Sequence, residues 1–333
     1  MTVVATTTAF VFAGQGVDPP WIAGDLVARD RARPLIDAAS DATSADIRSL
    51  LLRGGGALAR TEIAQPALAT ACLIAAAALE DHGVLPDVAC GHSLGELVAW
   101  AAGGYVSACD AIAVAAVRGR LMAREAKRHP GGMAAVHGER ADGASLARVR
   151  PGDATPGDAA SVRSIGAPPI EAVPHVARAL AAGRAHGSLV VAAENALDEH
   201  VVSGDPAAIA AVLAACPSQR LAVAGAWHSP AMAGAVGELG EALARIPQRA
   251  GVPFACNRDG RIAAAADIPA LLAGQLVHPI RWVDCLRTLA TFGVGRYVVI
   301  GPGKLMRALI RRTLGDVDVR VVQSEADLAR VCS

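Results

Sequence analysis

The sequence predicts an α/β protein whose parallel sheet is covered by helices on both faces. One observation is the alternation, along the first 131 residues, of short apolar runs with longer segments of helical periodicity. A second is the stretch GHSLG at residues 91–95, which joins an apolar run at 88–90 to a helical pattern. A third is the composition, 53% hydrophobic but only 3% aromatic, which predicts a core of Ala, Val, Leu and Ile.

Caps and glycines bound the elements of the first 131 residues. A helix at 65–81 ends at Gly83, and its apolar run is shorter than the ~18 residues that a membrane helix requires, so we expect it to be buried. Ser107 and Asp110 form a capping box that opens another helix. The expected elements, in order, are a strand at 9–13, a helix at 65–81, a strand at 88–90, a helix ending at Gly103 and a helix from 107 to about 128.

A change of pattern after residue 132 predicts a second, smaller domain. Its elements follow the order strand, helix, strand, strand, helix, which is typical of a ferredoxin-like unit. A stretch at 139–174, rich in Ala, Gly, Pro and Asp, predicts a long loop within it. We expect this small domain at 132–205, inserted between two parts of the large domain at 1–131 and 206–333. The expected elements are strands at 133–137, 189–193 and 199–203 and helices at 176–182 and 206–216, then strands of the large domain at 220–223 and 296–300 and a helix at 305–314.

Charge and cysteine content narrow the class of protein. Lys+Arg and Asp+Glu both number 31, which argues against binding nucleic acid or a membrane surface through net charge. The seven cysteines are an odd number without CxxC spacing, and the N-terminus lacks the basic region of a signal peptide. We therefore expect a protein of the reducing cytoplasm.

Ser93 lies between Gly91 and Gly95, at the turn from the expected strand to the expected helix. The pattern G-x-S-x-G is that of a nucleophile elbow, which strains the serine and lifts its hydroxyl above the strand ends. At a helix N-terminus, the backbone N–H of Leu94 and the helix dipole would face an oxyanion. A glycine-rich connection without chemistry is the alternative, but the strand before and the helix after favour a nucleophile.

A serine hydroxyl at its ordinary pKa needs a base, and the chain offers nine histidines. His92 precedes the serine but would point away from it in a tight turn. His228 follows an apolar run that we interpret as a strand of the resumed large domain, and Ser229 and Pro230 come next. It is the candidate base, with a structural histidine as the alternative.

Arg118 is expected on the buried face of its helix. A buried guanidinium requires an anion or several acceptors. Its partner is either a buried carboxylate such as Glu96 or the carboxylate of a bound substrate, and both readings stay open. The residues three and four positions away from it are all apolar, namely Val114, Ala115, Leu121 and Met122.

Nine stretches in order along nearly the whole chain resemble the malonyl-CoA:acyl-carrier-protein transacylase family, which includes acyltransferase domains of polyketide synthases. Each stretch is weak evidence alone, whereas the ordered set is specific. They are FVFAGQG, QPALATACL, GHSLGE, VRGRLM, GGMAAV, N-x(5)-VVSG, HSPAM, QLVHPIRW and IGPGKLM.

The resemblance implies a hydrolase-like large domain with an inserted ferredoxin-like domain, and it implies roles for individual residues. Ser93 would be the nucleophile, His228 its base and later acid, and Arg118 the group that binds the free carboxylate of a malonyl unit. The remaining implied roles are an oxyanion hole from the backbone N–H groups of Gln15 and Leu94, orientation of the histidine by Gln275, a position near the site for Asn195, and a position near the acyl α-carbon for Trp227.

The function implied by the resemblance is a ping-pong acyl transfer. A malonyl group would move from coenzyme A to Ser93 as an ester, and then to the phosphopantetheine thiol of an acyl carrier protein. No bound metal or organic cofactor is implied, and we expect a cytoplasmic monomer. Fatty-acid synthesis, a trans-acting acyltransferase of polyketide synthesis and malonate decarboxylase stay open as pathways. Two other functions stay open, an acyl hydrolase of the same fold and a carrier-docking protein without activity; the expected burial of Arg118 favours a transferase.

Overall fold

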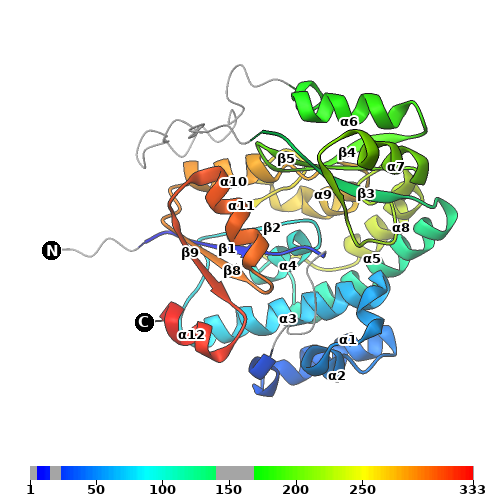
Figure 1. Ribbon diagram of the computed structural model, residues 1–333. Helices are drawn as coiled ribbons and strands as arrows, with labels where there is room; N and C mark the ends of the chain where they lie inside the picture. Colours follow the sequence, from blue (N-terminus) through cyan, green and yellow to red (C-terminus); the bar gives the residue numbers. More distant parts are fainter. Residues whose placement is uncertain (1–5, 16–23, 140–168, 333) are drawn as a thin grey trace.

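The computed structural model describes residues 6–15, 24–139 and 169–332, which form two sheets with helices around them (Figure 1). The larger sheet is parallel, and its strands in spatial order are β7 (Phe254–Ala255), β2 (Val88–Gly91), β1 (Thr8–Phe12), β8 (Arg296–Ile300) and β9 (Asp318–Val322). The central strand β1 buries all five of its residues. Its nearly continuous apolar sequence is typical of a parallel strand that is covered on both faces.

The smaller sheet is antiparallel, and its strands in spatial order are β4 (Leu189–Ala196), β5 (Glu199–Gly204), β3 (Gly132–His137) and β6 (Ser218–Arg220). Two helices, α6 (Pro174–Arg184) and α7 (Pro206–Ala215), pack against it and against each other. The chain order β3-α6-β4-β5-α7-β6 is ferredoxin-like. The expected fold class, an α/β body with a small inserted antiparallel domain, is confirmed.

The small domain extends further along the chain than the boundary expected at residue 205. Its fourth strand, β6, pairs with β3 from Ala134–Arg220 to Val136–Ser218. The expectation of a large-domain strand at 220–223 is wrong, because residue 220 already pairs in the small sheet and residues 221–227 form a loop. The small domain therefore runs from residue 132 to residue 220. Residues 140–168 of the expected long loop lie outside the described residues.

The helices around the parallel sheet lie in two layers (Figure 1). Their bounds are α1 Ala32–Thr43, α2 Ile47–Arg53, α3 Thr61–Asp81, α4 Leu94–Ala102, α5 Ala108–Arg128, α8 Ala233–Ala244, α9 Ile268–Gly274, α10 Trp282–Thr291, α11 Lys304–Leu314 and α12 Glu325–Cys332. On one side of the sheet α3 packs against α5, with α1 against both. On the other side α10 and α11 contact β4, so the small domain sits over that layer.

Two of the expected helices have the surroundings that the sequence predicts. Helix α3 is apolar over a length that would cross a membrane, but 89% of its most apolar 18-residue window is buried inside the protein. It is therefore a core helix, as expected. The expected start of α5 at Ser107 is also confirmed, because Ser107 is the N-cap and its Oγ accepts the backbone N–H of Asp110 at 3.1 Å.

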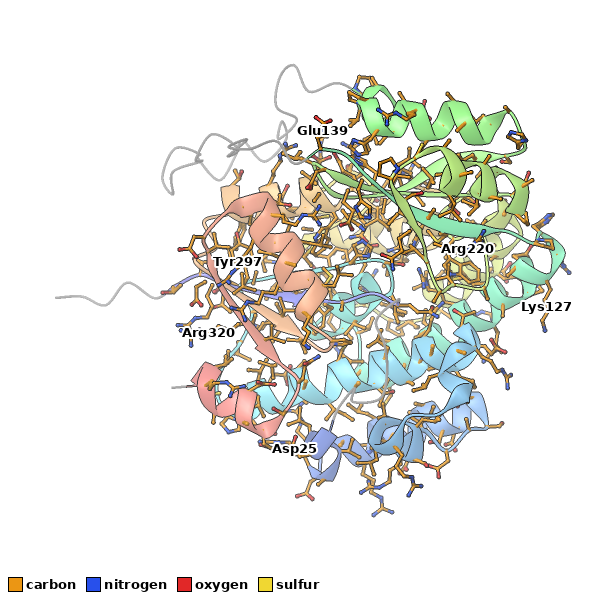
Figure 2. All side chains as sticks on the ribbon, in the orientation of Figure 1. Asp25, Lys127, Glu139, Arg220, Tyr297 and Arg320 are labelled. Atoms are coloured by element: carbon orange, nitrogen blue, oxygen red, sulfur yellow. The ribbon has the colours of Figure 1, made fainter. Side chains whose placement is uncertain are left out.

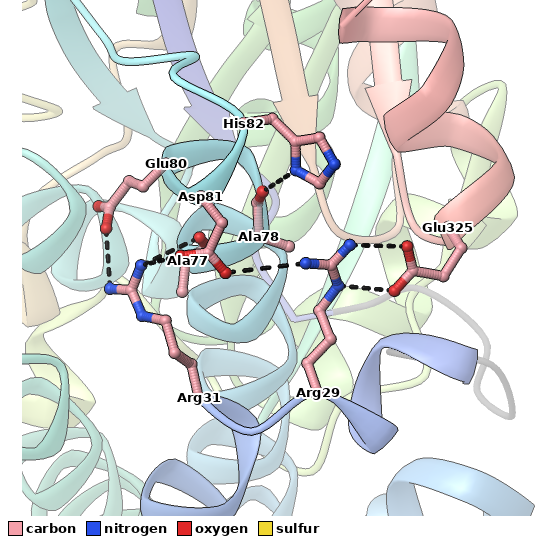
Figure 3. A network of polar contacts seen from close by, with 8 residues as sticks. All are labelled: Arg29, Arg31, Ala77, Ala78, Glu80, Asp81, His82 and Glu325. Carbon is pink, nitrogen blue, oxygen red and sulfur yellow. Dashed lines mark hydrogen bonds and ion pairs between the residues drawn. The ribbon is translucent and has the colours of Figure 1, made fainter.

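Two arginines from the segment before α1 hold the C-terminal end of α3 (Figure 3). Arg29 donates two hydrogen bonds to Glu325 of α12, at 2.6 and 2.8 Å, and lies 3.7 Å from Asp81. Arg31 donates to Asp81 at 2.8 Å and to the carbonyl oxygen of Ala77 at 3.1 Å. Positive charge is favourable at a helix C-terminus. The contacts also join three segments that are distant in sequence, namely the one before α1, the end of α3 and the start of α12.

Candidate active site

The chain turns from β2 into α4 at Ser93, which has φ +54° and ψ −109°. A residue other than glycine in this region costs about 1–3 kcal/mol and is held there by its surroundings. Glycine is required on both sides of it. A Cβ at Gly91 would lie 2.0 Å from the carbonyl of Gly95, and a Cβ at Gly95 would lie 2.3 Å from the carbonyl oxygen of Phe12. The turn thus presents the Ser93 hydroxyl at the carboxyl edge of the sheet and at a helix N-terminus.

His228 lies beside this hydroxyl, with its Nε2 atom 2.8 Å from Ser93 Oγ. Its other ring nitrogen, Nδ1, is 2.9 Å from the carbonyl oxygen of Gln275. Because a carbonyl oxygen only accepts, Nδ1 carries the proton and Nε2 is left to accept the serine proton. His228 follows a loop rather than the expected strand, and its φ of +56° shows a tight turn before the short 3₁₀ helix Pro230–Met232.

Arg118 reaches the same hydroxyl from the middle of α5. Its side chain is 4% exposed, whereas Lys127 at the end of the same helix points outward (Figure 2). Arg118 Nη2 donates to Ser93 Oγ at 3.2 Å. The Ser93 hydroxyl therefore lies between a histidine that can take its proton and a positive charge.

Two glutamines hold the guanidinium in place. Arg118 Nη1 donates to Gln65 Oε1 at 2.7 Å, and Nη2 donates to Gln275 Oε1 at 2.8 Å. Among the described residues no carboxylate lies within 4 Å of Arg118, so Glu96 is not its direct partner. A buried cation whose acceptors are neutral amides is suited to binding an anion that enters the site.

Burial sets the protonation states of these groups. It lowers the pKa of His228 to about 3, and the positive charge of Arg118 acts in the same direction. It also lowers the pKa of Arg118, to about 10, so the guanidinium stays charged at neutral pH. The site therefore holds a neutral imidazole base beside a fixed positive charge, which is the state that proton abstraction from serine requires.

The two backbone N–H groups that are expected to form an oxyanion hole adjoin the elbow. Leu94 is the first residue of α4, and Gln15 follows the loop after β1. That loop packs on the elbow, since a Cβ at Gly14 would lie 2.6 Å from the carbonyl oxygen of His92. Within the described ranges neither backbone N–H, of Gln15 or of Leu94, has an acceptor. Their role in an oxyanion hole stays a prediction.

His92 points away from Ser93, as expected. Its Nε2 atom lies 2.9 Å from Asn195 Oδ1, and its ring meets Trp282 edge-on at 5.5 Å between centroids. Asn195 in turn donates to Glu199 Oε1 at 3.1 Å. Asn195 lies on β4, so its contact joins the small domain to the elbow rather than reaching the serine hydroxyl.

Trp227 packs in the core. Its side chain is 5% exposed, and a Cβ at Gly225 would lie 2.5 Å from its ring and 2.8 Å from Ala126 of α5. Trp227 does not line the cavity at Ser93, and the position near the acyl α-carbon that the resemblance implies for it stays a prediction. The cavity of about 10 Å³ beside the nucleophile, room for about one water, is lined by Ser93, Leu97, Val114, Arg118, Leu239, Leu243, Leu272 and Gln275.

Asn257 is a site residue that no sequence pattern indicates. It follows β7, and its Oδ1 accepts the backbone N–H of Ser93 at 2.8 Å while its Nδ2 donates to the carbonyl oxygen of Gly91 at 2.7 Å. Gln65 was also missed as a partner of Arg118, although it opens the stretch QPALATACL. A polar residue that opens an apolar helix is the signal that could have pointed to Gln65.

The fold and the site together define an α/β acyl transferase. Residues 9–166 match the acyl transferase domain family. A malonyl CoA-acyl carrier protein transacylase of Mycobacterium tuberculosis is 32% identical over 323 residues, which are 94% of each chain. The chain therefore belongs to the malonyl CoA-acyl carrier protein transacylase family, and it is a transferase.

Solved structures agree with this assignment. A malonyl-CoA:acyl carrier protein transacylase of Xanthomonas oryzae superimposes with a TM-score of 0.80 at 30% identity, covering 99% of this chain and 98% of the other. A malonyl-transacylase solved in complex with its type II polyketide acyl-carrier protein has the same TM-score at 24% identity, covering 98% and 99% of the two chains. The second likeness concerns the fold alone.

Proposed function

We propose that this enzyme moves a malonyl group from coenzyme A to the phosphopantetheine thiol of an acyl carrier protein through an ester on Ser93. The observation that carries this proposal is the position of one hydroxyl between His228 Nε2 at 2.8 Å and Arg118 Nη2 at 3.2 Å. A base on one side and an anion-binding cation on the other match an acyl group that ends in a carboxylate.

In the first half-reaction His228 Nε2 takes the proton of Ser93 Oγ as that oxygen attacks the thioester carbon. The oxyanion would accept hydrogen bonds from the backbone N–H groups of Gln15 and Leu94. Collapse breaks the C–S bond, and His228 returns the proton to the departing thiolate. The carrier thiol then gives its proton to His228, attacks the ester and releases Ser93 with its proton restored. No step in this scheme requires a metal or an organic cofactor.

Intact-mass measurement tests this scheme. Malonyl-CoA should add one malonyl group to the wild type and none to Ser93→Ala, and phosphopantetheinylated carrier protein should then remove it and gain the same mass. Release of free malonate at an unchanged rate without the carrier would indicate the hydrolase instead. Absence of any adduct from any acyl-CoA would indicate a carrier-docking protein and contradict the proposal.

The same proposal covers location, assembly and pathway. All seven cysteines are free, which supports the cytoplasm, and the proposed state in solution is a monomer. A panel of carrier proteins would separate fatty-acid synthesis from a trans-acting role in polyketide synthesis. Light scattering measures the mass in solution.

A further inference from the structure

Glu96 is a buried carboxylate that the scheme above does not use. It lies on α4, three residues after Ser93, and its side chain is 0% exposed. Within the described ranges no arginine, lysine or histidine forms an ion pair with it. An ionised group in such a place requires strong hydrogen bonds, and the first turn of a helix also favours its negative charge.

Two donors bind the two oxygens of this carboxylate. The backbone N–H of Asn257 donates to Glu96 Oε1 at 2.6 Å, and the side-chain Nε2 of Gln275 donates to Glu96 Oε2. These donors come from the segment after β7 and from the 3₁₀ helix Gln275–Val277. Glu96 thus joins two segments that each reach the catalytic groups.

The Asn257 arm holds the nucleophile elbow. With its backbone fixed by Glu96, the Asn257 side chain accepts from the N–H of Ser93 at 2.8 Å and donates to the carbonyl of Gly91 at 2.7 Å. These bonds clamp the strained turn on both sides of the serine. The clamp accounts for part of the constraint that keeps Ser93 at positive φ.

The Gln275 arm holds the base and the cation. Its Nε2 donates to Glu96 and to the carbonyl oxygen of Ser93 at 3.0 Å, which leaves Oε1 facing Arg118 at 2.8 Å. If the amide were flipped, its NH₂ group would meet the guanidinium, donor against donor. The backbone carbonyl of the same Gln275 accepts from His228 Nδ1.

We propose that Glu96 is a positioning residue for acyl transfer, whose carboxylate fixes Gln275 and Asn257 and thereby aligns Ser93, His228 and Arg118. The inference rests on the proposed function. The Glu96 carboxylate then acts in the reaction through Gln275 and Asn257, without touching a reacting atom.

This role makes the reaction sensitive to pH near neutrality. Burial raises the pKa of Glu96 to about 7. When Glu96 is protonated, one of its oxygens carries the proton and no longer accepts as a carboxylate. The hydrogen bonds that hold Asn257 and Gln275 are then weakened. The other titratable groups that face it are Arg118 from α5, Cys256 after β7 and Cys285 from α10. Arg118 stays charged. Both cysteines stay neutral, because burial raises the pKa of Cys256, and a side-chain hydrogen bond with Cys90, together with burial, raises the pKa of Cys285.

The pH range separates Glu96 from the base. The pKa of His228 is lowered to about 3, so His228 is unprotonated throughout the range from pH 5.5 to 8.5. A loss of acylation as the pH falls through about 7 would therefore come from Glu96. A residue that only filled the core would leave no such limb in the profile.

Single-turnover acylation of Ser93 by malonyl-CoA and by acetyl-CoA, measured from pH 5.5 to 8.5, tests the inference with Glu96→Gln. At pH 8 we expect Ser93 of this variant to be acylated about a hundredfold more slowly, because a displacement of the aligned groups by about 1 Å has an effect of this size. It should lose the limb near pH 7 and lower the ratio of malonyl to acetyl loading, because Arg118 is displaced. Glu125→Gln is the matched control, since Glu125 is also buried on a helix but is bound by Arg124 and Arg128.

Glu96→Asp keeps the test decisive if the glutamine variant does not fold. The shorter carboxylate should acylate slowly but keep a limb in its pH profile. Wild-type rates and an unchanged limb in Glu96→Gln, or no limb in the wild type and in Glu96→Asp, would overturn the inference. Loading of wild-type Ser93 tests the proposed function separately, so a failure of one is distinguishable from a failure of the other.

Discussion

The guanidinium of Arg118 donates a hydrogen bond to the hydroxyl of Ser93 over 3.2 Å. The group expected to recognise the far end of the acyl unit therefore touches the atom expected to carry its near end. In a malonyl ester the carboxylate lies two carbons beyond the ester carbonyl carbon, within a short reach of this cation. When the ester forms, Ser93 Oγ loses its proton and the carboxylate becomes the anion available to Arg118.

Arg118→Ala should exchange malonyl for uncharged acyl groups. Without its partner the substrate carboxylate enters a buried site unpaired, at a cost of about 3–5 kcal/mol by analogy with broken buried ion pairs. Acetyl-CoA meets no such penalty. Competition of the two thioesters for Ser93, read by intact mass, should show a large rise in the ratio of acetyl to malonyl loading. An unchanged ratio would mean that Arg118 only packs between Gln65 and Gln275.

His228→Ala should slow both half-reactions, because one imidazole takes and returns each proton. General acid–base assistance is worth ~10²–10⁴-fold in rate. Rapid-quench measurement of malonyl loading and of transfer to the carrier checks both steps. His200→Ala is the control, since His200 is 1% exposed but lies on β5 beside His175. Transfer within about tenfold of the wild type in His228→Ala would assign the base elsewhere.

Gly95→Ala should displace the elbow. The added Cβ would lie 2.3 Å from the carbonyl oxygen of Phe12, and backbone atoms cannot move aside as a flexible side chain can. We expect a loss of about 1–3 kcal/mol in the free energy of unfolding, with Ser93 drawn away from His228. Chemical denaturation and Ser93 loading measure the two effects.

Gly237→Ala is the control for this substitution. Gly237 lies exposed within α8, and nothing lies within 4 Å of an added Cβ there. In a helix interior alanine is favoured over glycine by roughly 0.5–1 kcal/mol, so this variant should be slightly more stable and load normally. Equal stability of the two alanine variants would show that the elbow tolerates a Cβ at position 95.

The elbow and the fold class could be predicted because their requirements are local. Gly91 and Gly95 flank the serine within five residues, and the alternation of apolar runs with helical segments is visible in short windows. The prediction of a strand at 220–223 was wrong because it, too, rested on a local pattern alone. The apolar run there is a partly exposed loop, with Ala222 and Ala224 exposed, so an apolar run does not by itself establish a buried strand.

The partners of the catalytic groups could not be predicted, because their contacts are distant in sequence. Asn257 binds the N–H of Ser93 across 164 positions, and Gln65 binds Arg118 across 53. No spacing rule connects such residues. Glu96 could be named from the sequence only as a possible partner of Arg118, whereas the structure places Gln275 between them.

Trp227→Ser should lower stability and leave acyl selectivity unchanged. By resemblance this indole would crowd an α-methyl branch and favour malonyl over methylmalonyl by roughly ten- to two-hundredfold. Its ring packs beside Gly225, and it is not among the residues that line the cavity at Ser93. Removing a buried tryptophan costs about 3–5 kcal/mol. The unfolding midpoint should therefore fall, while competition between malonyl-CoA and methylmalonyl-CoA gives the wild-type ratio.

Leu272→Ala is the counterpart to Trp227→Ser. Leu272 lines the cavity of about 10 Å³ beside Ser93 and Arg118, which has room for about one water. Removing its branched end enlarges the space next to the nucleophile, so the competition ratio should move toward methylmalonyl. This comparison shows which residue sets the acyl selectivity, because both variants lose buried apolar volume but only Leu272→Ala loses it at the cavity beside Ser93. If Trp227→Ser shifts the ratio and Leu272→Ala does not, the indole reaches the acyl group during the reaction and the cavity wall does not set its size.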